Sequence, residues 1–336
     1  MTSRPLRPHP LAVAGLALAA SAAACADPAR DASGRGGGGG DVSVAEVAAE
    51  LEAVSGALTP TQRATFREVL EDTLEKDAWA CHPSPRQVFS GVGADGDRLV
   101  SGTMPHYGFF FGPMQYLVRR ERDSWRVEAR IAVEPPAGTA SLELPDCVLR
   151  PKLDGPAACS GRAYSDSGST EACPRSGSFS APATPRNVSA LLQRWSTDAE
   201  AYWNRDALRY GIPVTYDFDF VRADEAAARG LRVDMALPLS PTCGRTPYFS
   251  AFRSGWSLPV VAHEVGHLLG LLDEYEAFSG IVGFYPKTPF PGAEVSRMGL
   301  SMREATLVLP LHHYLVLRRW FCLPPASPDP YRHAAP

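Results

Sequence analysis

Residues 263 to 275 limit the possible fold and chemistry of this chain more than any other segment. They read His-Glu-Val-Gly-His-Leu-Leu-Gly-Leu-Leu-Asp-Glu-Tyr. On a helix, residues four positions apart lie on one face, so His263 and His267 would present both imidazoles to the same ion. Glu264 stands beside this pair, where a carboxylate could take a proton from a water on the metal. The spacing therefore predicts a helix that carries a metal centre.

A third ligand is available ten residues after His263, at Asp273. A helix turns by about 100° per residue, so an uninterrupted helix would point Asp273 away from His263 and His267. Gly270 stands where the helix has to end, because glycine adopts the left-handed conformation at little cost. Two imidazole nitrogens, one carboxylate oxygen and an open fourth position are the arrangement of catalytic zinc. We therefore expect one Zn²⁺, held by His263, His267 and Asp273.

The same segment would also make an ordinary amphipathic core helix. Its apolar positions are Val260, Val261, Val265, Leu268, Leu269, Leu271 and Leu272. A core helix, however, has no use for His263, Glu264 and His267 near one face, because burying these side chains without partners is costly. The metal-binding interpretation is therefore preferred.

The motif resembles that of the metzincin clan of metalloendopeptidases, His-Glu-x-x-His-x-x-Gly-x-x-His followed by a Met-turn. This chain has Asp273 in place of the last histidine, as snapalysin-like metzincins do, and Glu274 is the neighbouring alternative ligand. Met302 is the Met-turn candidate, with Met298 as the second choice. The resemblance covers residues 186–322 and implies an α+β fold with a twisted mixed sheet, an active-site helix, a Met-turn and a C-terminal helix.

The resemblance implies a zinc endopeptidase that hydrolyses peptide bonds of protein or peptide substrates. Glu264 would be general base toward the water and then acid toward the leaving amine. One alternative is a gluzincin-type peptidase, whose third ligand would be Glu294 or Glu304, but Gly270 would then have no purpose. Another is a non-catalytic envelope protein with a structural zinc. The intact Glu264 argues against it, because a structural zinc needs no base.

The beginning of the chain resembles an export signal. An apolar run from Leu11 to Ala24 follows two arginines and ends at Cys25. Residues 1–25 are therefore expected to be a lipoprotein-type signal peptide with Cys25 lipidated, although the usual leucine three positions before the cysteine is absent. An ordinary signal peptidase site is the alternative. The Gly-rich residues 26–42 would then tether an exported protein, either to the cell envelope or, without the lipid, outside the cell.

Seven cysteines are present in the chain. Without Cys25 six remain, which is enough for three disulfides in an oxidising compartment. Sequence does not fix the connectivity; the favoured pairs are Cys159–Cys173, Cys243–Cys322 and Cys81–Cys147. The Cys81-His82-Pro83 segment also resembles a latency thiol that blocks zinc, but the even cysteine count favours a disulfide.

The overall composition is that of a globular protein with 45% hydrophobic residues over 336 positions. This length is sufficient for a core and for two domains. The 33 basic and 37 acidic side chains give a net charge of −4, which does not support nucleic-acid binding. After residue 24 no apolar segment is long enough to cross a membrane.

Residues 43–150 are expected to form a small α+β accessory domain. It would begin with a helical hairpin over residues 43–77, in which Ser43 with Glu46 and Thr59 with Gln62 fit capping boxes. Strands would follow from 86 to 147, and the clearest is the alternating segment 125–133.

Residues 151–185 are rich in Ser, Gly and Pro and are expected to be a linker. The metzincin-like catalytic domain would occupy residues 186–322, before a Pro-rich tail at 323–336. Its expected elements are a long helix after 186, strands at 214–220 and 231–237, the metal helix, and a last helix at 311–320.

Four further residues are candidates for the site. His312, His313 and Tyr314 could reach the substrate cleft, and Tyr314 could stabilise an oxyanion. We favour a helix start packed below the site for these three. His106 stands among aromatic residues and is better explained as part of a strand.

Overall fold

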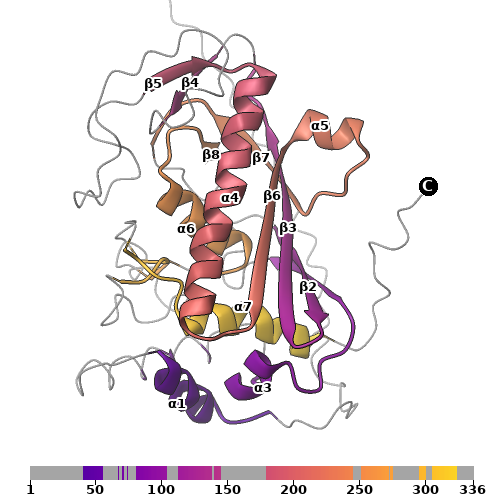
Figure 1. Ribbon diagram of the computed structural model, residues 1–336, viewed down its shortest axis with the longest axis vertical. Coiled ribbons are helices and arrows are strands. Elements are labelled where there is room, and N and C mark those ends of the chain that lie inside the picture. The colour runs from indigo at the N-terminus through magenta and orange to yellow at the C-terminus, as the bar shows by residue number, and fades with distance from the viewer. Residues whose placement is uncertain are drawn as a thin grey trace, which may run out of the picture. The chain divides into compact units, whose positions relative to one another are not determined.

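A mixed β-sheet with helices packed against it makes up the part of the chain that the computed structural model describes (Figure 1). The described residues are 41–55, 67, 70, 71, 74, 81–103, 113–137, 140–144, 179–244, 251–271, 273–274, 295–299 and 305–323. The expected α+β class is confirmed. The predicted signal peptide, Cys25 and nearly all of the tether and tail lie outside these residues.

The main sheet combines antiparallel and parallel pairing. Its strands are β1 (Arg98–Thr103), β2 (Pro113–Glu121), β3 (Ser124–Glu134), β6 (Val214–Arg222), β7 (Met235–Ser240) and β8 (Phe252–Arg253). Strands β1, β2 and β3 are antiparallel neighbours. β3 also pairs in parallel with β6, which places Trp125 opposite Val214, and with β7, which places Ile131 opposite Met235. β8 continues the sheet beyond β7.

Strand β3 is central to the sheet, and its position corrects the predicted domain organisation. The predicted alternation is confirmed, because Trp125, Val127 and Ile131 are buried while the arginines between them are partly exposed. Since β3 lies in the 43–150 segment and pairs with strands of the 186–322 segment, both share one sheet and one core. The predicted separate accessory domain is therefore wrong. Alternation reveals a half-buried strand, but it does not reveal which strand lies beside it.

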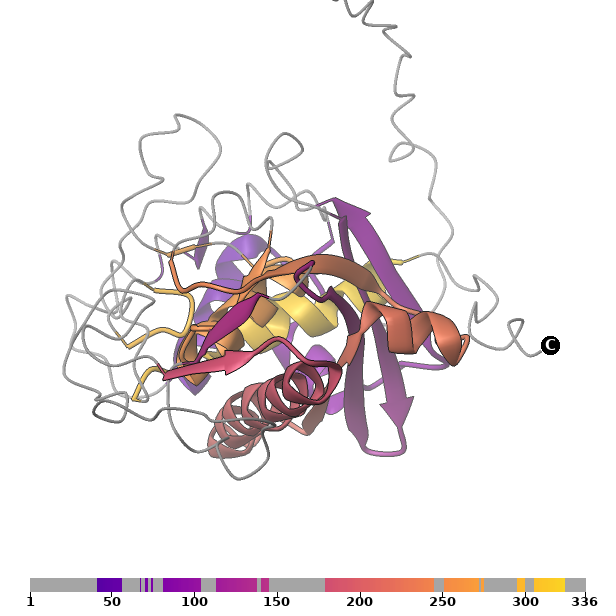
Figure 2. The same cartoon turned by 90° about the horizontal axis from the view of Figure 1, so that it is seen from above.

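Helix α4 (Pro185–Arg209) packs along β6 and against the metal helix α6 (Leu258–Leu268). It begins at Thr184, whose hydroxyl accepts a hydrogen bond from the Asn187 amide. Figure 2 shows α4 nearly along its axis, beside the sheet. The predicted long helix is confirmed, as is the strand at 214–220. The strand predicted at 231–237 instead begins at Met235, after the short helix α5 (Ala223–Ala228).

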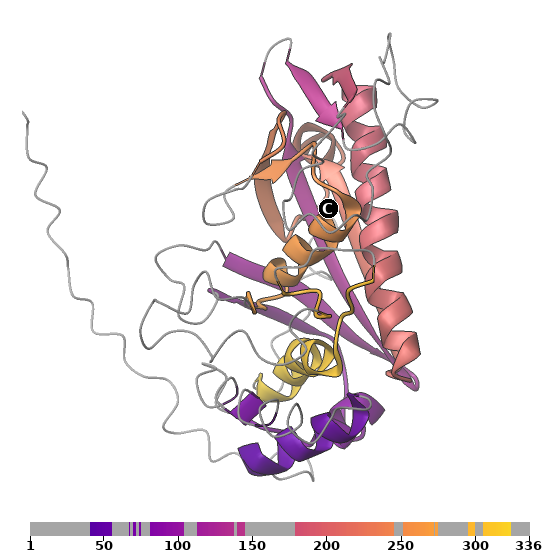
Figure 3. The ribbon, with the colours of Figure 1, turned by 90° about the vertical axis from the view of Figure 1, so that its left-hand side faces the viewer.

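Three helices lie together below the metal helix: α1 (Val44–Val54), α3 (Pro85–Ser90) and α7 (Pro310–Cys322). α7 contacts α1 and α3 and lies between α6 and α1 in Figure 3. The capping box of α1 is present, with Ser43 and Glu46 bonded reciprocally. Of the second predicted helix, the described residues Arg67, Leu70, Glu71 and Leu74 are helical, and both leucines are buried. The Thr59–Gln62 box lies outside the described residues.

Part of the predicted linker is a strand. β5 (Phe179–Pro182) pairs antiparallel with β4 (Ser141–Leu144) in a separate two-stranded sheet. The linker assignment for 151–185 is therefore wrong at its end, where Ala181 is buried. No helix among the described residues meets the length and hydropathy needed to span a bilayer.

A disulfide joins Cys81, before α3, to Cys322 at the end of α7, with the two Cα atoms 5.6 Å apart. The predicted pairs Cys81–Cys147 and Cys243–Cys322 are therefore wrong, because the packing of α7 on α3 brings together cysteines 241 positions apart. The prediction that Cys81 is in a disulfide, and not a free latency thiol, is confirmed. Cys243 is also disulfide-bonded, to a cysteine outside the described residues. The predicted Cys159–Cys173 pair also lies outside them.

Candidate metal centre

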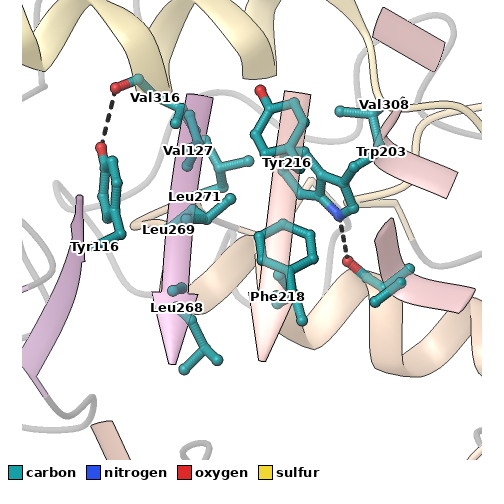
Figure 4. Packing of buried hydrophobic residues seen from close by; sticks show 14 of the residues in the cluster. Tyr116, Val127, Trp203, Tyr216, Phe218, Leu268, Leu269, Leu271, Val308 and Val316 are labelled. Atoms are coloured by element: carbon teal, nitrogen blue, oxygen red, sulfur yellow. Dashed lines mark hydrogen bonds between the residues drawn. The ribbon is translucent and has the colours of Figure 1, made fainter. Parts of the chain in front are cut away.

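Helix α6 carries both candidate histidine ligands. It begins after Ser257 with Pro259 in its first turn, and its apolar side chains are buried in the core. The indole Nε1 of Trp203, on α4, donates to the Ala262 carbonyl at 3.0 Å, which fixes α6 against α4 (Figure 4). Along α6 only Leu258 and Glu264 are partly exposed. The helix therefore buries its histidines and leaves the candidate base partly exposed.

Gly270 ends the helix as predicted. Its φ of 76° is left-handed, a conformation that glycine adopts without a steric penalty. The Gly270 amide donates to the His267 carbonyl at 2.8 Å, and the Leu271 amide donates to the Gly266 carbonyl at 2.9 Å. These two bonds form a Schellman motif, in which the chain reverses after the last helical turn. The reversal brings Asp273 back toward the histidines.

The three predicted ligands converge. Asp273 Oδ1 lies 3.1 Å from His263 Nε2 and 3.2 Å from His267 Nε2. All three side chains are buried, and their ligand atoms lie within 4.8 Å of one another. Among the described residues this is the group that could hold a metal ion.

The hydrogen bonds of the two histidines orient their Nε2 atoms toward Asp273. His263 Nδ1 lies 2.8 Å from the Arg297 carbonyl, and His267 Nδ1 lies 2.8 Å from the Leu271 carbonyl. Because a carbonyl only accepts, both Nδ1 atoms must donate, and Nε2 of a neutral ring then carries a lone pair. Asp273 Oδ1 is buried and faces both Nε2 atoms. When both rings are neutral, three ligand atoms therefore face one another, as binding of a cation requires.

In the metal-free site, the closeness of Asp273 to the histidines shifts the pKa values of His267 and Asp273. Burial opposes charge on His267, but the Asp273 carboxylate outweighs it and raises the pKa of His267 to about 9. Burial also disfavours the charged form of Asp273, yet the two imidazoles hold the pKa of Asp273 well below its usual range. Without a metal, a proton therefore occupies the position where a cation would lie.

Glu264 differs from the ligands in its exposure and in its pKa. Burial raises the pKa of Glu264 above that of an ordinary glutamate, and Asp273 adds to this rise, while the imidazoles of His267 and His263 oppose it. A raised pKa brings a carboxyl group nearer to the range where it can both accept and donate a proton. Its position next to His263 and its partial exposure suit a group that handles the proton of a water.

Glu274 lies outside the group that could hold a metal ion. Its Oε1 accepts a hydrogen bond from His312 Nε2 at 2.8 Å, and its Oε2 accepts one from the Ser296 hydroxyl. These bonds direct the carboxylate toward α7, while Asp273 points to the histidines. The predicted preference for Asp273 over Glu274 is therefore supported by the geometry.

A glycine and a methionine pack together on the buried side of α6. A Cβ atom added at Gly266 would collide with Met298 Sδ, so a larger residue would displace that side chain. Met298 is fully buried, and its carbonyl accepts a hydrogen bond from the Glu274 amide at 2.9 Å. Met298, the second choice for the Met-turn, thus lies against the metal helix. Met302, the first choice, lies outside the described residues, as do Glu294 and Glu304.

The favoured interpretation of His312, His313 and Tyr314 is confirmed, because all three are buried at the start of α7. The Tyr314 hydroxyl donates to the Pro83 carbonyl at 2.8 Å, away from the ligands. His106 lies outside the described residues. The link from His312 to Glu274 was not predicted, and neither was the contact of Arg319 with the end of α6. Buried-looking polar residues in a mostly apolar helix, two of them seven positions apart, are the signal that could have indicated both.

Comparison with known proteins gives no relative for this chain: no protein-family model, no curated protein and no solved structure matches it. The functional inference therefore depends on the site itself.

Proposed function

We propose that this chain is a zinc-dependent endopeptidase of the metzincin type. The observation that carries the proposal is the convergence of two imidazole lone pairs and one buried carboxylate oxygen beside a partly exposed Glu264. The left-handed turn at Gly270 and the methionine under the helix support it further.

The donor set favours zinc over the common hard cations. Ca²⁺ and Mg²⁺ take about six or more oxygen ligands, whereas the site offers two nitrogens and one oxygen. In a regular tetrahedron with zinc–ligand distances of about 2.0 Å, neighbouring ligand atoms are about 3.3 Å apart. The separations of 3.1 Å and 3.2 Å between Asp273 and the histidines are close to this value, and the three ligand atoms all lie within 4.8 Å of one another.

The proposed reaction is hydrolysis of a peptide bond by water. When bound, the zinc ion would supply Lewis-acid chemistry, polarising the scissile carbonyl and making water more acidic. Glu264 would accept the proton of the attacking water and return it to the amine nitrogen as the carbon–nitrogen bond breaks. The Nδ1 bonds of His263 and His267 hold their Nε2 atoms toward Asp273, where the ion would be bound. Asp273 would contribute a negative charge that partly balances the ion.

A purely structural zinc is the main competing function. Structural sites usually have four protein ligands, whereas the described residues provide three. The partial exposure of Glu264 also favours catalysis, because a structural site does not need a carboxylate at an open position.

The test is to measure zinc content and hydrolysis of casein for the wild-type chain and for Glu264→Gln. We expect about one zinc per chain in both, with hydrolysis only in the wild type. Glu200→Gln, a partly buried glutamate on α4, serves as the matched control and should keep activity. A wild-type chain that takes up no zinc would refute the metal centre, and a Glu264→Gln chain that hydrolyses casein normally would refute the mechanism.

We also propose that the protein is exported. Disulfides such as Cys81–Cys322 are typical of oxidising compartments, which supports a location outside the cytosol. Membrane attachment through lipidated Cys25 remains a prediction from the sequence.

A further inference from the structure

Two polar side chains of α7 contact the opposite ends of the ligand arm, which we define as residues 269–271 together with 273–274. They are His312 and Arg319, seven positions apart, so they lie on one face of α7 about 10 Å from each other along the axis. Both are buried in a helix whose other side chains are mostly apolar. Neither is a ligand, yet together they enclose the segment that carries Asp273.

Arg319 holds the beginning of the arm. Its Nη1 donates to the Leu269 carbonyl and, at 3.0 Å, to the Tyr116 hydroxyl, while its Nη2 donates to the Gly270 carbonyl at 2.8 Å. Carbonyls at a helix C-terminus have no partner within the helix, and a cation is favoured beside them. The rigid guanidinium plane, which holds two consecutive carbonyls, therefore fixes the direction in which the chain leaves α6.

His312 holds the end of the arm. The Leu309 amide donates to His312 Nδ1 at 2.9 Å, so the ring proton lies on Nε2 and is donated to Glu274 Oε1. The other oxygen of Glu274 accepts from Ser296, and its amide donates to the Met298 carbonyl. Glu274 is thus held on three sides, and its neighbour in the chain is the third ligand.

We propose that His312 and Arg319 are positioning residues that hold Asp273 at the metal, so that α7 is a functional part of the metal centre although it supplies no ligand. This inference rests on the proposed zinc site. Groups that orient ligands through hydrogen bonds typically change metal affinity by about 10- to 100-fold when they are removed. Here the orientation passes through the backbone of the ligand arm, and not through a bond to the ligand itself.

The first experiment measures the zinc dissociation constant by competition with a chelator for His312→Phe and Arg319→Met. Each should weaken zinc binding by about 10- to 100-fold. Arg318→Met is the matched control, since Arg318 is also buried in α7 but hydrogen-bonds the Cys81 carbonyl and His82 Nδ1. It should leave zinc affinity within about threefold even if it lowers the melting temperature. A loss of affinity no greater than in this control would overturn the proposal.

The second experiment asks whether both residues act through Asp273. In the Asp273→Ala chain, adding His312→Phe or Arg319→Met should cause little further loss of affinity, because the ligand that they position is gone. Cobalt(II) bound to the single variants should show an altered absorption spectrum, and cobalt in Arg318→Met should not. Full additivity of the losses, or an unchanged cobalt spectrum, would refute positioning of Asp273.

Milder variants keep the test decisive if a buried substitution unfolds the chain. Arg319→Lys keeps the charge but not the rigid fork, and it should lose less affinity than Arg319→Met. Glu274→Gln removes the charge that His312 contacts and should lose affinity in the same direction. Zinc affinity is measured without a peptidase assay, so a chain that binds zinc but hydrolyses nothing refutes only the proposed function. A wild-type chain that binds no zinc refutes both.

Discussion

His313 should make the folded protein sensitive to acid. Its ring is fully buried beside Trp203 and Tyr216, and Nδ1 lies 2.7 Å from the Tyr216 hydroxyl. Burial lowers the pKa of His313 from 6.5 to about 3, and the neighbouring His312 contributes to the decrease. Burial also raises the pKa of Tyr216 well above its usual value, so the hydroxyl keeps its proton and can donate it to His313.

The sign of the effect follows from the two pKa values. The unfolded chain protonates this histidine below about pH 6.5, whereas the folded chain does so only near pH 3. Between these values the unfolded state binds more protons, so stability falls as the pH decreases. Each pH unit of acidification within this window lowers the free energy of unfolding by about 1.4 kcal/mol. A change from about pH 7.5 to pH 5 therefore lowers it by about 2 kcal/mol through this one residue.

The assay compares urea unfolding at about pH 7.5 and pH 5, with a chelator present and the disulfides intact. The wild-type chain should lose about 2 kcal/mol more between the two pH values than His313→Phe does. Tyr216→Phe is the control: it removes the hydrogen bond but leaves a buried histidine, so it should keep the wild-type dependence on pH. Equal losses in the wild type and His313→Phe would show that His313 is not neutral in a buried environment, and the reasoning would fail.

Three further predictions concern the metal centre and the beginning of the chain. Gly270→Ala should lower the free energy of unfolding by about 1–2 kcal/mol through backbone strain and should also weaken zinc binding. Gly211→Ala, at a similar φ, should lower stability as much with no change in zinc affinity. Equal zinc affinities of the two variants would contradict the role of the turn. Asp273→Ala should weaken zinc binding more than Glu274→Ala in chelator competition, and the reverse order would exchange the ligand assignment. Mass spectrometry of the mature protein should find a lipid-modified Cys25 at the N-terminus, and an unmodified N-terminus at another residue would instead indicate free secretion.

The convergence of the three candidate ligands was predictable because His263, His267, Gly270 and Asp273 are close in the sequence. The helical period places His263 and His267 on one face, and the conformational freedom of glycine at position 270 returns Asp273 to them. These arguments concern one helix and one turn, so they do not depend on the rest of the fold. The helices α4 and α7 and the strand β3 were predictable for the same reason, since each shows its own period.

The pairing of distant segments could not be predicted in this way. The parallel pairing of Trp125 with Val214 brings together strands on either side of the predicted linker, and no local pattern indicates it. The Cys81–Cys322 disulfide depends on α7 reaching α3, which is a property of the packed chain. Periodicity therefore identified α4, α7 and β3 but not their assembly, and the strands predicted from residue 86 begin only at Arg98, after helix α3 (Pro85–Ser90).

The candidate ligands are close together in the sequence, whereas the residues that support them are distant. The carbonyl that holds His263 is 34 positions away at Arg297, the histidine that holds Glu274 is 38 positions away, and Arg319 is 49 positions from Gly270. A metal site built only from the local motif would leave the ligand arm free to rotate about its glycine. The contacts of α7 with this arm restrict that rotation. The distant contacts and the local motif therefore both fix the position of Asp273 Oδ1. Activity should accordingly be lost by substitutions in α7 that leave all three ligands unchanged.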